Sequence, residues 1–100
     1  MKKDKKHFRG CLIGGAVGDA LGWPVEFLKY QEIVKKYGSM SITDLDLGNK
    51  DLAEITDDTQ MTMFTAEGLL RAATRSSEKG ESNLPSVIFH AYQRWLVTQG

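Results

Sequence analysis

Apolar positions recur with helical spacing in four stretches of the chain, and no stretch alternates apolar and polar residues as a strand would. The pattern predicts helices over about residues 8–21, 28–37 and 58–74, and from Pro85 onward. The last of these has apolar residues at i, i+1, i+4, i+5, i+8 and i+9 from Val87 to Leu96, which is the stripe of a helix with one buried face. The fold class is therefore predicted to be all-α.

The first predicted helix carries a glycine face, formed by Gly10, Gly14, Gly18 and Gly22 at every fourth position. Residues four apart lie on one side of a helix. Each interior glycine costs about 1 kcal/mol of helix propensity relative to alanine, so a compensating interaction is needed. We expect another helix to approach this face closely. Pro24 should then end the helix or turn the chain.

Two polar stretches separate the remaining helices. Residues 39–55 are rich in turn-forming residues and predict a long loop, of a kind that is often functional, and residues 76–83 predict a linker. The apolar stripe of the last helix runs almost to Gly100, and three other helices offer little surface to cover it. We therefore expect the chain to be part of a larger domain, or one half of an assembly.

The charge balance argues against a nucleic-acid partner. Lys and Arg total 13, as do Asp and Glu, whereas nucleic-acid binders need a basic excess. Residues 1–9 predict a basic, flexible terminus. The apolar run that follows is interrupted by Asp19 and is shorter than the ~20 residues that span a bilayer, so we expect no membrane partner and a cytoplasmic location. The single cysteine, Cys11, excludes an intrachain disulfide and is expected to be a core residue.

Four oxygen-bearing side chains, Thr56, Asp57, Asp58 and Thr59, lie at the start of the predicted third helix. Such hard oxygen donors suit Mg²⁺, Ca²⁺ or Mn²⁺. Threonine and aspartate are also favoured helix caps, and from composition alone capping is the better supported interpretation. Adjacent acids repel each other unless a cation or hydrogen bonds compensate, which favours a metal site. Both interpretations stay open at this point.

Two further acids, Asp19 and Glu26, are candidates for chemistry. Asp19 interrupts an apolar, glycine-bearing helix, where a carboxylate is costly unless it is paired. Glu26 follows Pro24 in a turn, a position suited to a general base or a positioning carboxylate. The alternatives are a hydrogen-bonded structural acid for Asp19 and an ordinary surface acid for Glu26.

Three landmarks resemble the ADP-ribosylglycohydrolase family. Residues 10–26, GCLIGGAVGDALGWPVE, resemble its opening helix, and residues 55–61, ITDDTQM, look like its metal-binding signature. The helix that contains Tyr92 and Trp95 is similar to the next conserved helix of the family. Their order and separation are much more specific than any one of them alone, and together they cover the chain from Gly10 onward.

The resemblance implies an all-α domain that holds two magnesium ions in a cleft, with Mn²⁺ as a possible substitute. Thr56, Asp57 and Asp58 would be metal ligands, and Glu26 and Asp58 would be catalytic. Glu26 would also position the nucleophilic water or the ribose. Asp19 would support the first helix and contribute to substrate binding. Residues 10–100 would then be the N-terminal, incomplete portion of the family's helical domain, that is, about the first four helices of a multi-helix orthogonal bundle.

The implied activity is Mg²⁺-dependent hydrolysis of the N- or O-glycosidic bond between ADP-ribose and a protein side chain or small molecule. The family's second cluster of Asp and Thr ligands is absent from this sequence. We therefore expect the isolated chain to bind metal weakly and not to be competent alone, with a C-terminal half or self-association completing the site. The alternative is a non-catalytic helical interaction module or inactive relative, in which the acids are caps and the glycine face is a packing surface.

Overall fold

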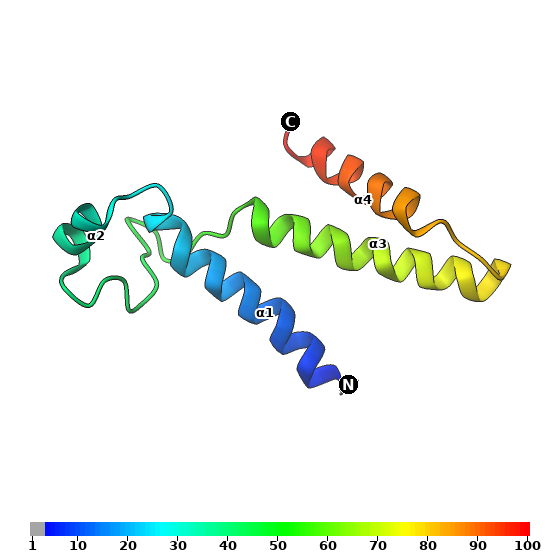
Figure 1. Ribbon diagram of the computed structural model, residues 1–100, viewed down its shortest axis with the longest axis horizontal. Coiled ribbons are helices and arrows are strands. Elements are labelled where there is room, and N and C mark those ends of the chain that lie inside the picture. The colour runs from blue at the N-terminus through cyan, green and yellow to red at the C-terminus, as the bar shows by residue number, and fades with distance from the viewer. Residues whose placement is uncertain (1–3) are drawn as a thin grey trace. The chain divides into compact units, whose positions relative to one another are not determined.

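The computed structural model of the protein describes residues 4–100, and within them it contains helices but no strand (Figure 1). The all-α prediction is confirmed. The elements are α1 (Lys5–Gly22), the 3-10 turn η1 (Trp23–Val25), α2 (Tyr30–Tyr37), α3 (Asp57–Lys79) and α4 (Leu84–Thr98). In the described part of the chain no single helix is long and apolar enough to cross a membrane. Only the pair Lys5–Val25 and Tyr30–Tyr37, which is bent by 101°, has the length and apolar composition of a membrane span when its two segments are taken together.

Helix α1 begins earlier than the apolar pattern predicts, because Asp4 caps it. The Asp4 side chain accepts a hydrogen bond from the Lys6 backbone N–H at 3.0 Å. Residues 5–9, which the sequence assigns to a flexible terminus, are therefore helical, while residues 1–3 of that terminus lie outside the described residues. The helix ends at Gly22, and Pro24 lies in the turn that follows, as predicted.

The predicted C-terminal end of α2 and the predicted start of α4 agree with the structure to within one residue, whereas α2 begins at Tyr30 and not at residue 28. Gly38 follows α2 with a φ of +89°, a left-handed conformation that glycine adopts without steric cost. The Asn83 side chain caps α4 by accepting a hydrogen bond from the Ser86 N–H at 3.1 Å. The predicted linker, in contrast, is partly wrong, because residues 76–79 continue α3 up to Gly80, which has a φ of +82°.

Contacts divide the chain into an N-terminal unit, Met1–Thr59, and a C-terminal unit, Gln60–Gly100, and each is described here on its own. No large side chain of the described residues is fully buried, so the core is small. The buried side chains of the N-terminal unit are Ala20 and Thr59, and those of the C-terminal unit are Ala72, Val87 and Ala91.

In the C-terminal unit, α3 and α4 run side by side in opposite directions, and Gly68 allows their close approach (Figure 1). A Cβ atom added at Gly68 would lie 3.0 Å from both the Ala91 Cβ and the Ile88 Cδ1. We call this contact the Gly68 seam. The hydroxyls of Thr65 and Tyr92 share a hydrogen bond of 2.6 Å beside it.

The glycine face of α1 behaves differently from the prediction. A Cβ atom added at any of its four glycines would have no described atom within 4 Å, apart from its own helix and chain neighbours. Within the N-terminal unit no described helix therefore makes the expected contact on this face. Cys11, which was expected in the core, is exposed on the same helix.

The long loop after α2 is held by the carboxylate of Asp46. The Tyr37 hydroxyl donates to Asp46 Oδ2 at 2.6 Å, and the Gly48 N–H donates to Oδ1 at 2.9 Å. Lys36 Nζ lies 3.6 Å from the same carboxylate. These hydrogen bonds lower the pKa of Asp46 below its usual value of 3.8, with the Tyr37 hydroxyl as the largest cause.

Candidate functional site

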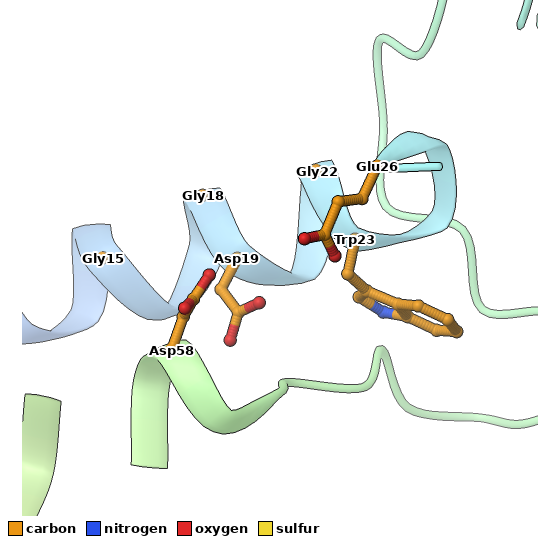
Figure 2. A pocket seen from close by; sticks show the side chains of 7 residues that line it. All are labelled: Gly15, Gly18, Asp19, Gly22, Trp23, Glu26 and Asp58. Carbon is orange, nitrogen blue, oxygen red and sulfur yellow. The ribbon is translucent and has the colours of Figure 1, made fainter. Parts of the chain in front are cut away.

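The N-terminal unit contains an open pocket of about 390 Å³ along the C-terminal half of α1. Its wall combines bare helix backbone with three carboxylates and one indole (Figure 2). The lining residues are Gly15, Gly18, Asp19, Gly22, Trp23, Glu26 and Asp58. The two segments with the predicted chemistry, residues 10–26 and 55–61, thus meet at one cavity.

Three glycines give this pocket its shape. Gly15, Gly18 and Gly22 are spaced by three and four residues and so lie on one side of α1. Because they have no side chains, the helix backbone itself forms the wall. Sequence reasoning missed this function: the glycine spacing was the available signal, but it was interpreted as a helix contact. Trp23 adds an aromatic side chain to the lining.

The carboxylate of Asp19 connects α1 to the start of α3. Asp19 Oδ2 accepts from the Thr56 N–H at 2.7 Å, the Thr59 N–H at 3.2 Å and the Thr59 hydroxyl at 2.6 Å. Asp19 Oδ1 accepts from the Thr56 hydroxyl at 2.7 Å. The expectation that Asp19 is paired is met, and sequence reasoning had identified neither Thr56 nor Thr59 as its partner.

Two opposing effects act on the ionisation of Asp19. Burial raises the pKa of its carboxyl, but the hydrogen bonds from Thr59 and Thr56 lower it and together prevail, so that the pKa lies below its usual value of 3.8. Asp19 is therefore a carboxylate at neutral pH, and all four donors point at a negative charge.

The predicted metal-binding segment begins α3. Thr56 caps the helix, since its Oγ1 accepts from the Asp58 N–H at 3.3 Å, so the capping interpretation is confirmed for this residue. Asp57 and Asp58 occupy the first turn, where carboxylates suit the helix dipole. Both are exposed, but Asp58 lines the pocket and points toward α1, whereas Asp57 is not part of the lining (Figure 2).

The chemistry of this segment fits a hard cation. The hydroxyl and carboxylate oxygens of Thr56, Asp57 and Asp58 are the donors that Mg²⁺ and Mn²⁺ prefer. Within residues 4–100, however, no three His, Cys, Asp or Glu side chains gather closely enough to hold a metal ion. The described residues therefore fit one part of a coordination sphere.

Glu26 lies just after η1, at the end of the pocket beside Trp23 (Figure 2). Its backbone N–H donates to the Trp23 carbonyl at 3.2 Å, which fixes the turn that carries both residues. Pro24 lies in the same turn and restricts its backbone. The structure thus brings Asp19, Glu26 and Asp58 to one cavity.

Comparison with known proteins assigns this arrangement to a family. Residues 1–100 match the family model of the ADP-ribosylglycohydrolases. The chain belongs to the ADP-ribosylglycohydrolase family. The resemblance of its three sequence landmarks is thereby confirmed.

Two curated proteins match this chain over about two thirds of the chain's length. An uncharacterized protein from Archaeoglobus fulgidus is 40% identical over 67 residues, which cover 66% of this chain and 22% of that protein. ADP-ribosyl-[dinitrogen reductase] glycohydrolase from Rhodospirillum rubrum is 38% identical over 66 residues, which cover 65% of this chain and 22% of that protein. The match therefore spans about a fifth of the length of these relatives. No solved structure matches the chain.

Proposed function

We propose that the protein hydrolyses the glycosidic bond that links ADP-ribose to a protein side chain or small molecule, in a reaction that depends on Mg²⁺ or Mn²⁺. Membership of the ADP-ribosylglycohydrolase family supports the reaction class. The observation that carries the proposal is that Glu26 and Asp58 line the same pocket. Asp19 lies between them in the lining and binds Thr56, at the start of the predicted metal-binding segment. The protein would act in the cytoplasm.

The substrate class follows from the same comparison. The R. rubrum relative is named for ADP-ribosylated dinitrogen reductase, so an ADP-ribosylated protein is the first substrate to test. Trp23 adds an aromatic surface to the pocket wall, and such surfaces pack well against the apolar faces of sugars and bases. The bare backbone at Gly18 and Gly22 leaves room for a bulky ligand beside it.

The residues of this chain divide into two roles in the proposed reaction. Thr56, Asp57 and Asp58 would hold the cation through their oxygens. When bound, Mg²⁺ supplies Lewis acidity, orients ribose hydroxyls and lowers the pKa of a bound water. Glu26 would accept the proton of the water that attacks the anomeric carbon, or orient that water, because its carboxylate lies at the same pocket as Asp58.

The test is release of ADP-ribose from an ADP-ribosylated protein by the complete protein, followed by liquid chromatography and mass spectrometry. We expect turnover with Mg²⁺, none after EDTA treatment, and a fall in kcat of about 100-fold or more in Glu26→Gln and in Asp58→Asn. Asp51→Asn is the matched control, since Asp51 is an exposed loop acid outside the pocket. Full turnover in both pocket variants would refute the proposal.

The second candidate function, a non-catalytic binding module, is favoured by one observation: Thr56 caps α3. In that case the acids at the start of α3 stabilise the helix and nothing more. Thermal unfolding with and without MgCl₂ and ADP-ribose separates the two functions. Joint stabilisation by both ligands supports the hydrolase, and an unchanged Tm supports the module.

A further inference from the structure

The Asp19 carboxylate accepts four hydrogen bonds from the start of α3. The donors are the N–H and hydroxyl groups of Thr56 and Thr59, at 2.6–3.2 Å, and three of them share Oδ2 while one uses Oδ1. A carboxylate offers about four acceptor sites, so most of the capacity of Asp19 is directed at these two residues, although it also lines the pocket. Its clearest action on the site therefore passes through the residues that it holds.

The hydroxyl of Thr56 shows what this hold achieves. A threonine oxygen carries one proton and two lone pairs. The proton is donated to Asp19 Oδ1 at 2.7 Å, and one lone pair accepts from the Asp58 N–H at 3.3 Å. The other lone pair is available for a cation, because the proton is held toward Asp19. A hydroxyl that binds a metal ion must direct a lone pair, and not its proton, at the ion. A hydroxyl without Asp19 would be free to rotate and turn its proton toward a cation.

The Thr59 contacts hold the other end of the same segment. Thr59 is buried, and its N–H is one of the first amides of α3, which have no acceptor within the helix. Asp19 supplies that acceptor from another helix. Asp57 and Asp58 therefore project from a stretch of backbone that is fastened on both sides, at Thr56 and at Thr59, to α1.

We propose that Asp19 is a positioning residue for the cation site: by binding Thr56 and Thr59 it presents the Thr56 oxygen and the Asp57 and Asp58 carboxylates as preorganised ligands. The inference rests on the proposed function, since it requires a cation at this segment. It replaces the expected role of Asp19 in substrate binding with a role in the support of the ligands. Partners that orient metal ligands in this way commonly change metal affinity by about 10- to 100-fold when they are removed.

The test measures Mn²⁺ affinity and backbone protection separately in the complete protein. Electron paramagnetic resonance titration with Mn²⁺ alone gives the affinity, and amide hydrogen exchange of metal-free protein gives the protection of Thr56 and Thr59. In Asp19→Asn we expect about 10- to 100-fold weaker Mn²⁺ binding and faster exchange of both amides. Saturating Mn²⁺ should restore much of kcat in this variant, because the ligands themselves remain.

Two further variants distinguish a positioning role from a general loss of structure. Asp58→Asn removes a ligand rather than its support, so it should weaken Mn²⁺ binding while the Thr59 amide stays protected. Thr59→Val removes one of the four hydrogen bonds and should reproduce the Asp19→Asn effects at smaller size, which keeps the test decisive if Asp19→Asn does not fold.

The outcomes separate the inference from the proposed function. Unchanged Mn²⁺ affinity in Asp19→Asn, with normal binding by the wild type, overturns the inference alone. Weaker Mn²⁺ binding with fully protected Thr56 and Thr59 amides also overturns it, because Asp19 would then act on the cation directly. A wild-type protein that binds no Mn²⁺ overturns the metal dependence of the proposed function together with the inference.

Discussion

Glycines serve opposite purposes in the two units of this protein. On α1 no segment of the N-terminal unit packs against the glycine face, and two of its members, Gly18 and Gly22, form the wall of a pocket together with Gly15. On α3 a single glycine, Gly68, lies so close to α4 that a methyl group would press on Ala91. The comparison teaches that glycine spacing predicts a bare helix surface, whereas the opposing segment decides whether that surface becomes a contact or a cavity.

The two units also differ in what holds them. In the N-terminal unit two carboxylates, Asp19 and Asp46, fasten loops through directional hydrogen bonds. In the C-terminal unit α3 and α4 make apolar contact at the Gly68 seam, and hydrogen bonds between Thr65 and Tyr92 and from Trp95 to Gln60 flank it. Directional bonds fix the position of polar groups, as a chemical site requires, while apolar contact fixes only distance and shape.

The largest effect should come from filling the seam. Gly68→Leu must displace Ile88 and the fully buried Ala91, so we expect a loss of about 2 kcal/mol in the free energy of unfolding, measured with urea. The matched change on α1, Gly14→Leu, should leave stability unchanged or raise it by up to about 1 kcal/mol. Equal losses in the two variants would mean that the glycine face is a covered contact after all.

A smaller change tests whether the ligand contacts the glycine wall of the pocket. Gly18→Ala should stabilise α1 by up to about 1 kcal/mol through helix propensity, yet weaken ADP-ribose binding by about tenfold, because its methyl group enters the pocket. Gly10→Ala, outside the lining, should give the stabilisation without the loss of affinity. Calorimetric titration of both variants checks this, and equal affinities would show that the ligand does not use this wall.

The smallest expected effect concerns acid pH. Because the folded-state pKa of Asp46 lies below 3.8, its contribution to stability is complete above that value and is lost as the pH falls through the lowered pKa. Tyr37→Phe removes the largest cause, so the pKa of Asp46 should rise toward 3.8 in a carbon-13 NMR titration. An Asp46 pKa that does not move would contradict the assigned cause.

Periodicity sufficed to predict the helices, because apolar spacing is a local property. The ends were less predictable: Asp4 adds a turn to α1, and the polar residues 76–79 continue α3 since nothing before Gly80 stops it. Local spacing also cannot tell whether Asp57 or Asp58 faces the pocket, because successive residues are rotated by roughly 100° about a helix whose starting residue was uncertain.

The pairing of Asp19 with Thr59 was beyond sequence reasoning for a different reason. The cost of a carboxylate in an apolar helix predicted that Asp19 needs donors, but not which ones. The partners lie 37 and 40 residues away, and contacts at that separation leave no periodic trace in a single sequence. The family resemblance indicated both segments, while only the structure joined them atom to atom.

The position of Trp23 has a practical consequence. The chain has two tryptophans, and they fall in different units: Trp23 on the wall of the pocket and Trp95 in α4, where its Nε1 donates to Gln60. In a Trp95→Phe background, the remaining indole is a native fluorophore at the pocket. Its emission then follows occupancy of the cavity in real time, without any label attached to the protein.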